Sequence, residues 1–403
     1  MIKDDSIIFG IIALLIALIN SISSSDRPAL KSFFSFFPSI LLVYLLPALG
    51  TTLGLFDISQ SILYQFNIDH LLPACLILMT LSLDIKSLKQ LGPKCLMVFL
   101  AGTTGVILGG PVSLIIVNFL MPESVPSDAW KVLSTLAGSW IGGGVNQAAM
   151  KEVFHVEETI FVTSVAVDIV VGAFFWMSTM LFLANKNKKI NQWLRADDSL
   201  VRNLDFSSDK DSTQASFNDY CWMIGIAFGG TAISRLIALP LVDWIKLHAP
   251  GLEKYNLTSV FFWVIIFASF IGILSSLTSL RNLESKGASK IGNVLLYLLV
   301  ASIGLKINLS QIWSSPVFFL IGFIWILFHG FFIFFIARLL KAPLFFVAVG
   351  SQANIGAAAS APIVASAFAS HLAPVGVILA ILGYVLGNYG AYVCALLMKW
   401  VLS

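Results

Sequence analysis

The sequence has very little charge for its length. Only 11% of its 403 residues are Asp, Glu, Lys or Arg, whereas 58% are hydrophobic. Soluble domains carry about 25% charged residues, so this composition excludes an ordinary soluble protein. Apolar runs near the ~20 residues needed to cross a bilayer recur from end to end. We therefore predict an integral, multi-pass protein of the cell membrane that is surrounded by lipid.

The few charges that exist, and the scarce cysteines and histidines, exclude further classes. The net charge of +3 is small and spread over loops, so no nucleic-acid partner is expected. The 4 Cys and 5 His form no CxxC pair and no metal-ligand spacing. The sequence also lacks a P-loop, an HExxH helix and a nucleophile elbow. We expect no cofactor, no built-in ATP-driven pump and no enzyme.

The apolar runs predict about twelve membrane-spanning helices, within a range of eleven to thirteen. A membrane core offers no water to pair with the backbone, so runs of this length form helices and the fold class is all-α. The first run follows Lys3, Asp4 and Asp5, whose net negative charge is unlike a signal peptide. The expected spans are 6–23, 35–55, 68–84, 94–120, 131–150, 157–184, 219–241, 257–280, 289–305, 314–340, 343–369 and 372–402.

A hydrophilic segment divides the chain into two halves. Residues 185–218 are predicted to be a solvated linker, between a first transmembrane repeat at 1–184 and a second at 219–403. The halves share two patterns in the same order: "LSLDIKSL" resembles "IGLKINLS", and "AGSWIGGGVNQAAM" resembles "VGSQANIGAAASAP". Such weak internal symmetry, with glycine-interrupted segments in corresponding places, is typical of a secondary transporter.

The loop charges indicate that the two repeats are inverted. Lysines after the third span and Arg338 with Lys341 after the tenth place both loops inside, because inside loops are rich in Lys and Arg. A count of twelve spans would instead make the glycine-rich segments parallel. The conflict lies in 185–280, where "KNKK" reads inside by charge and outside by parity. We predict inverted repeats and leave the span count open.

The glycine-rich segment of the first half reads "GSWIGGGVNQAA". Each glycine costs about 1 kcal/mol in a helix interior relative to alanine, so we predict a broken helix at about 131–150. Backbone groups freed at the break would have to line a cavity or be buried in protein. Close packing of small residues is the alternative explanation. The polar or ligand-exposing positions of this segment are Ser139, Gly143, Gly144, Asn146 and Gln147.

The corresponding segment of the second half reads "GSQANIGAAASAP". Pro362 removes one helix hydrogen bond, so a second broken helix is predicted at about 343–369. If the two broken helices cross at the membrane centre, their amides would form an uncharged polar cluster. The candidate residues of this segment are Ser351, Gln352, Asn354 and Ser360.

Asp168 is the most informative single residue. It lies about eleven residues into the span 157–184, hence roughly 16 Å along a helix. A carboxylate at that depth is costly unless it is paired or hydrated. It could form a structural pair with Arg235 or Lys306, or it could bind a cation or proton with Asn146 and Thr163 near it. We favour the ion site.

Both glycine-rich segments carry a family resemblance. The stretches "GSWIGGGVN" and "SQANIGAAASAPIVASAFASHLAPVGVILAILGYVLGNY" resemble an uncharacterised membrane family, domain of unknown function 819. That family is grouped with cation–proton antiporters, bile-acid symporters and auxin carriers. The resemblance implies an NhaA-like fold with two crossing discontinuous helices, and an acidic ion site at Asp168. The second acid found beside it in some antiporters is absent, since Val167 and Ile169 flank Asp168.

These observations predict a secondary active transporter that works by alternating access. The partners would be a small organic solute (an organic anion, an amino acid or a short peptide) and a coupling ion, Na⁺ or H⁺. A cation/proton antiporter is the runner-up, an intramembrane enzyme or a receptor is the alternative of another class, and a homodimer stays open. The ion is expected at Asp168, Asn146, Thr163 and Ser139, and the solute at Gln147, Gly143, Gly144, Ser351, Gln352, Asn354 and Ser360.

Overall fold

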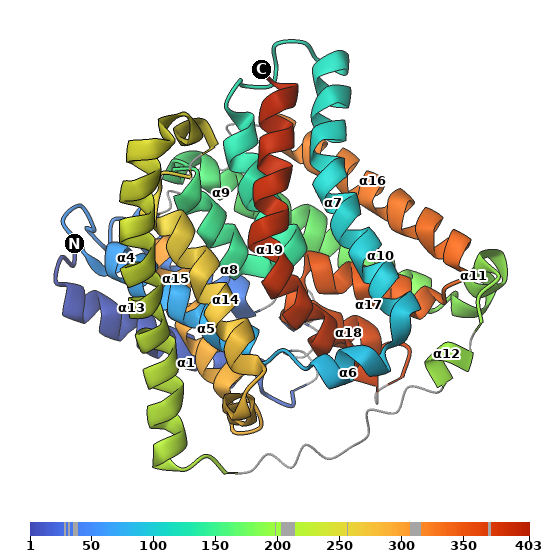
Figure 1. Cartoon of the computed structure of the whole chain (residues 1–403), viewed down its shortest axis with the longest axis horizontal. Coiled ribbons are helices and arrows are strands. Elements are labelled where there is room, and N and C mark those ends of the chain that lie inside the picture. Colours follow the sequence, from blue (N-terminus) through green and yellow to red (C-terminus); the bar gives the residue numbers. More distant parts are fainter. Residues whose placement is uncertain are drawn as a thin grey trace.

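The structure is a computed structural model of the chain, and it is built from helices (Figure 1). It describes all residues except 28–29, 31–32, 35–38, 198, 203–213, 256, 307–315 and 370–371. Within the described residues no β-strand forms, and Ile2 and Phe56 make one isolated bridge. The all-α prediction is therefore confirmed for this part of the chain.

Helices occupy every predicted span. In chain order they are α1 (Asp5–Ser23), α3 (Ser39–Thr52), α4 (Leu63–Phe66), η1 (Asn67–Leu71), α5 (Leu72–Leu81), α6 (Ile85–Gln90), α7 (Gly92–Leu120), α8 (Ala129–Val153), α9 (Glu158–Val167), the π-helix η2 (Asp168–Trp176), α10 (Met177–Ala184), α11 (Asn187–Leu194), α12 (Ser199–Arg202), α13 (Phe217–His248), η3 (Pro250–Tyr255), α14 (Val260–Ser276), η4 (Ser279–Leu283), α15 (Ala288–Leu305), α16 (Val317–Leu340), α17 (Leu344–Ile355), α18 (Ala357–Ser366) and α19 (Ala373–Val401).

Seven of the described helical stretches are long and apolar enough to cross a membrane: α1, α7, 160–184, α13, α15, α16 and α19. Four shorter apolar helices, of 10–17 residues, lie at 42–52, in α14, in α17 and in α18. The chain is thus a multi-pass membrane protein, and the predicted number of twelve spans is not confirmed.

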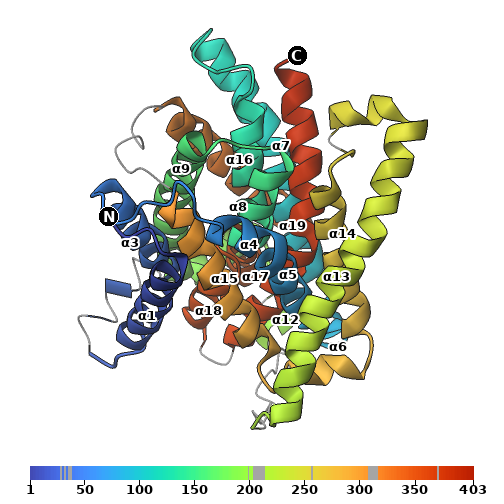
Figure 2. The same ribbon diagram turned by 90° about the vertical axis from the view of Figure 1, so that its left-hand side faces the viewer.

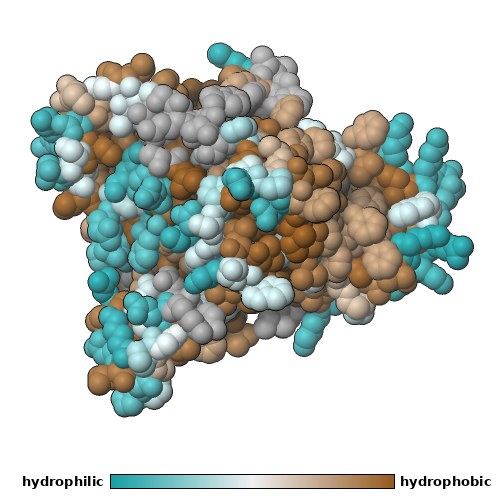
Figure 3. Space-filling view, turned by 90° about the horizontal axis from the view of Figure 1, so that it is seen from above, coloured by the Kyte–Doolittle hydropathy of each residue, from teal (hydrophilic) through white to brown (hydrophobic). Residues whose placement is uncertain are grey.

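The outer helices present apolar side chains where a soluble protein would present charge. On α16, Leu327, Phe331, Phe335 and Leu339 are 50–70% exposed and recur every fourth residue, so they form one stripe. An exposed apolar stripe of this length fits contact with lipid. Figure 3 shows the molecule from above, where hydrophilic side chains gather in several clusters with hydrophobic surface between them.

Helix α8 is broken in the middle by two glycines. Gly142 has φ −143° and ψ 17°, and Gly143 has φ 75° and ψ −173°. The conformation of Gly143 belongs to a region that only glycine adopts readily. The predicted break is therefore present in the first glycine-rich segment, and it turns the chain sharply.

The two arms of α8 lie side by side as a helical hairpin. The rings of Trp130 and Phe154, one at each end, are 5.2 Å apart. A Cβ added at Gly138 would lie 2.6 Å from the backbone oxygen of Asn146, whereas residues eight apart in a straight helix are about 12 Å apart. The chain consequently leaves on the side where it entered.

The helices α17 and α18 form a second hairpin. Gly356 separates them, and Ala357, the first residue of α18, has a φ of 48°. The side chains of Gln352 and Ser360 then meet at 2.7 Å. The rings of Phe345 and Phe368, near the two ends, are 5.3 Å apart. This segment also returns to its starting side.

The predicted crossing of two discontinuous helices is therefore wrong for these segments. Both segments break where glycines predict, but the break reverses the chain instead of continuing it through the membrane. The conflict between the loop charges and the span count disappears for the same reason. Residues 131–150 were counted as one crossing of the membrane, but the chain leaves this segment on the side where it entered. The "KNKK" stretch lies at the same end of the molecule as Arg338 and Lys341. Helix α11, which overlaps this stretch, is fastened there, because Asn191 accepts a hydrogen bond from the N–H of Leu344 at 2.7 Å and Arg338 donates to the carbonyl of Trp193.

The hairpins enter from opposite ends of the molecule and meet at their tips. Helix α7 runs from α6 to the start of the first hairpin, and α19 runs upward from the second hairpin (Figure 1). We call these ends the α6 end and the α4 end, because Tyr64 of α4 contacts Glu152 at the base of the first hairpin. At the tips, a Cβ added at Gly143 would lie 2.8 Å from the Cβ of Ala357.

We expect Gly143→Ala to lower the free energy of unfolding by about 1–3 kcal/mol, the cost of forcing a side chain into this backbone region. The new methyl group would also press on Ala357. Thermal unfolding of the purified protein in detergent would measure the loss. The matched control is Gly144→Ala, whose Cβ would meet no atom within 4 Å. Equal unfolding temperatures for the two variants would contradict the tight turn.

The helices pack as two groups. Helices α1, α3, α5, α13, α14 and α15 form one connected group, with α13 at its outer edge in Figures 1 and 2. Helices α7, α9, α10, α16 and α19 surround the two hairpins and form the other. We call them the α13 group and the hairpin group. Each half contributes its first helices to one group and its last to the other.

The predicted linker lies partly outside the described residues. Its described part forms the short helices α11 and α12. In α11, Asn191 and Leu194 are buried, and Trp193 is 55% exposed. The helix therefore docks one face on the protein at the α6 end.

Candidate functional site

A cavity of about 760 Å³ lies between the two groups of helices. Its walls come from α1, α3 and α15 on one side and from both hairpin tips, α9, η2 and α19 on the other. Such a volume suits a small organic molecule. Most of the lining is apolar, and the polar residues that line it are Asn20, Tyr44, Ser139, Gln147, Asp168, Lys290, Asn293, Tyr297, Ser360 and Tyr384.

Asp168 faces this cavity where α9 passes into the π-helix η2. Ser139 donates a hydrogen bond to its Oδ2 at 2.7 Å, and the indole N–H of Trp140 donates to its Oδ1 at 2.8 Å. Both donors lie on the entering arm of the first hairpin. Two neutral hydrogen bonds hold the carboxylate in place and leave its remaining lone pairs toward the cavity.

Neither base considered as a structural partner pairs with Asp168. Arg235 lies 3.6 Å from Asp69, and Lys306 lies 3.7 Å from Glu158. Among the described residues, no ion pair includes Asp168. A half-buried carboxylate without a protein cation in a membrane span is free to bind a proton or another cation.

The two other predicted ion ligands lie elsewhere. Asn146 is fully buried, donates to the carbonyl of Gly142 at 2.6 Å and lies against Gly387, so it supports the break in the hairpin. Thr163 is also buried and does not line the cavity. Neither residue is a hydrogen-bond partner of Asp168 in the described part of the chain, and their part in an ion site stays a prediction.

Four of the predicted solute positions line the cavity, and three do not. Gly143, Gly144 and Gln147 line it from the first hairpin, and Ser360 lines it from the second. Gln352 lies behind Ser360 and donates to its hydroxyl. The remaining two, Ser351 and Asn354, face away from the cavity.

Ser351 and Asn354 instead fasten the second hairpin to its neighbours. Ser351 accepts from the indole N–H of Trp176 at 2.8 Å and contacts His329 at 2.7 Å. Asn354 accepts from Thr103 at 2.8 Å and donates to two backbone carbonyls. Their hydrogen bonds are used for packing, so they have no free group for a solute.

The opposite wall of the cavity could not be predicted from the sequence. Asn20, Tyr44, Lys290, Asn293 and Tyr297 lie singly in apolar spans or near span ends. Only the three-dimensional packing of α1, α3 and α15 brings them together. Arg281 pairs with Asp84 beside α6. Because Lys290 follows shortly after Arg281 in the chain, we assign Lys290 to the α6 end, where its side chain is exposed.

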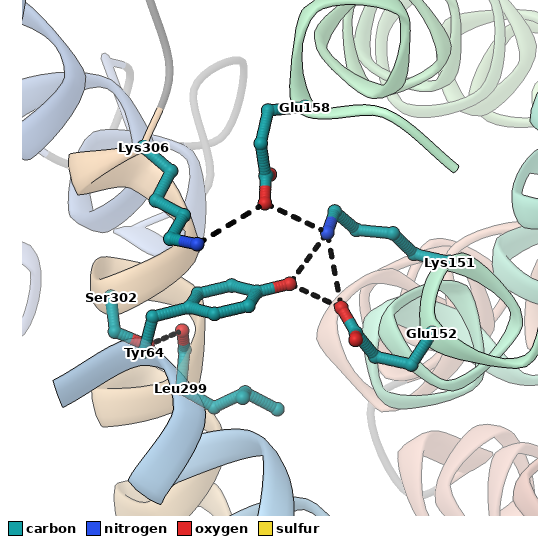
Figure 4. A network of polar contacts seen from close by, with 7 residues as sticks. All are labelled: Tyr64, Lys151, Glu152, Glu158, Leu299, Ser302 and Lys306. Atoms are coloured by element: carbon teal, nitrogen blue, oxygen red, sulfur yellow. Dashed lines mark hydrogen bonds and ion pairs between the residues drawn. The ribbon is translucent and has the colours of Figure 1, made fainter. Parts of the chain in front are cut away.

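A network of charged groups lies at the other end of the cavity (Figure 4). Lys151 is 4% exposed, and its ammonium lies 2.5 Å from the hydroxyl of Tyr64, 3.0 Å from Glu152 and 3.1 Å from Glu158. Lys306 reaches Glu158 and lies 4.0 Å from the centroid of the Tyr64 ring. The two lysines and the two glutamates balance in formal charge.

This network lies one helical turn beyond the cavity wall on three helices. Lys151 follows the lining residue Gln147 by four positions, Lys306 follows Ile303 by three, and Glu158 precedes Phe161 by three. Residues three or four apart share a helix face. The network therefore covers the α4 end of the cavity. Tyr64 and Lys306 lie on the side of the α13 group, whereas Lys151, Glu152 and Glu158 belong to the hairpin group.

Comparisons with known proteins agree with this membrane architecture. The family model described as "Protein of unknown function (DUF819)" matches residues 6–401. The chain is also 23% identical over 358 residues to the "Uncharacterized membrane protein YjcL" of Bacillus subtilis (strain 168), covering 84% of each protein. Since the family model spans nearly the whole chain, the protein belongs to the DUF819 family of membrane proteins.

Proposed function

We propose that this protein is a secondary active transporter that moves a small organic solute together with Na⁺ or H⁺ by alternating access. The observation that carries the proposal is the cavity between two groups of helices, with the tips of two hairpins and the unpaired Asp168 in its wall. Intramembrane carboxylates that lack a base partner are typical of ion and proton pathways.

The arrangement of the helices supports inverted repeats. If both hairpins return to their own side, the first half crosses the membrane with α1, α3, α5, α7 and the segment α9–α10, an odd number. The second half crosses with α13, α14, α15, α16 and α19. An odd number of crossings turns the second half upside down relative to the first, and inverted repeats are common in secondary transporters.

The charges at the two ends support an orientation. The α6 end carries Lys89 and Lys94, the "KNKK" stretch, Arg338 and Lys341. Since Lys and Arg are enriched in cytoplasmic loops, we assign the α6 end to the cytoplasm. In this conformation the cavity would face inward, and the network of Tyr64, Lys151, Glu152, Glu158 and Lys306 would close it toward the outside.

Closure of one end and exposure of the other is what alternating access requires of a single conformation. The network joins the two groups of helices by hydrogen bonds and ion pairs at the α4 end. Relative movement of the groups would break those contacts and open that end. Asp168 and both hairpin tips move together because all belong to the hairpin group.

Reconstitution in proteoliposomes tests the proposal. We expect uptake of radiolabelled solutes, screened as amino acids, short peptides and organic acids, to rise when a Na⁺ or proton gradient is imposed. A cation/proton antiporter would instead show proton movement driven by Na⁺ without any organic solute. Absence of both gradient-driven fluxes from correctly folded protein would refute transport.

A further inference from the structure

The hairpin tips carry an amide donor that has no acceptor. Gln147 is 5% exposed and lines the cavity from the returning arm of the first hairpin. Its Nε2 has no hydrogen-bond partner among the described residues. A buried amide left unpaired costs about 1–3 kcal/mol, so this group needs an acceptor that the protein does not supply.

The start of α18 presents further donors to the same cavity. Ala357, Ala358 and Ala359 line it, and no side chain caps this helix at Gly356. The first-turn N–H groups of α18 have no helical acceptor, and the positive end of the helix dipole lies with them.

Two hydroxyl groups extend this set of donors. Ser360 accepts from Gln352 Nε2 at 2.7 Å, so its own proton is free to be donated elsewhere. Tyr44, on the opposite wall, is 7% exposed, and its hydroxyl has no partner in the described part of the chain. Gln147, Ser360 and the start of α18 therefore form a region of donors, which we call the tip donors, and the hydroxyl of Tyr44 adds one donor from the other wall of the cavity.

We propose that the tip donors bind the carboxylate of an organic solute, while Asp168 binds the coupling cation beside it. This inference rests on the proposed transport function and names its substrate class. A carboxylate needs several donors and little formal charge. Among the described residues that line the cavity, Lys290 is the one base, whereas a phosphate recruits Arg or several Lys.

The placement of the two sites explains why solute and ion would bind together. Ser139 holds Asp168, and Ser139 lies four residues before Gly143, at the tip that touches Ala357. A cation at Asp168 would thus lie close to the bound carboxylate, and each charge would lower the cost of burying the other. The apolar remainder of the cavity fits an uncharged body of the solute.

Thermal unfolding of the full-length protein in lipid nanodiscs tests this inference. The probes are N-acetyl amino acids and aliphatic dicarboxylates, each compared with its own neutral amide, in NaCl and in choline chloride at two pH values. We expect at least one carboxylate to raise the unfolding temperature while its amide does not. Gln147→Glu should weaken that carboxylate at least about tenfold, the effect of losing one hydrogen bond to a charged group.

The controls separate this inference from the proposed function. Gln192→Glu, on the exposed face of α11, should leave the carboxylate effect unchanged. A cation effect that survives Gln147→Glu and disappears in Asp168→Asn would place the two sites as proposed. If amides stabilise as well as carboxylates, or no probe stabilises, the tip donors do not bind a carboxylate, although gradient-driven flux could still establish transport.

Discussion

Asp168→Asn should reduce gradient-driven uptake in proteoliposomes to the level of protein-free liposomes. The substitution preserves the shape of the side chain and one of the two acceptors that bind Ser139 and Trp140, but it removes the negative charge that would bind Na⁺ or a proton. Since no described base pairs with Asp168, the loss of this charge should not leave an unpaired cation. The fold should therefore survive.

The matched control is Asp243→Asn, an exposed aspartate on α13. It should retain the flux of the unchanged protein. Circular dichroism and the unfolding temperature would establish that both variants fold. If Asp168→Asn kept its dependence on the ion gradient, Asp168 would have no part in coupling, and the ion would have to bind elsewhere.

Lys151→Met should open the α4 end of the cavity. The substitution leaves Glu152 and Glu158 without their shared ammonium, so the contact between the two groups of helices weakens. Removing one partner of a buried pair costs about 3–5 kcal/mol. We expect less than that here, because Glu152 and Glu158 are 20% and 29% exposed and solvent screens them.

Thiol labelling measures this opening. A Cys221→Ser background removes the exposed cysteine, while the other three are buried. In that background Ala148→Cys places a thiol in the cavity wall. A membrane-impermeant reagent added from the α4 end should modify it about tenfold faster with Lys151→Met, equivalent to ~1.4 kcal/mol. Lys189→Met is the matched control, and equal rates would show that the network is not the closure.

The sequence predicted the breaks in both hairpins, because glycine clusters are costly in helices and their effect is local. It did not predict the reversal of direction. Hydropathy reports only the length of an apolar segment, so a hairpin of the length of α8 looks like a helix that crosses the membrane. The difference becomes clear only in the structure, where Trp130 and Phe154 at the two ends of the segment are in contact. The span count and the parity conflict followed from that one ambiguity.

The sequence also placed half of the candidate site. Asp168 and Ser139 could be found because a deep carboxylate and a hydroxyl beside glycines are rare in apolar spans. Lys151, Glu158 and Lys306 could not be found, since charged residues occur at the ends of most spans and nothing in the chain pairs them. Tyr44 was missed because a single tyrosine in an apolar run gives no signal until packing leaves its hydroxyl unpartnered.

The packing of the first hairpin has a consequence for how the protein is made. Helix α8 has 25 residues but is not among the described helices apolar enough to span a membrane alone. Its break lies against α19, where Gly383 approaches Gly142 and Gly387 approaches Asn146. Helix α19 begins at Ala373, far beyond the first hairpin in the chain, so the first hairpin cannot reach its final place until α19 has also been synthesised.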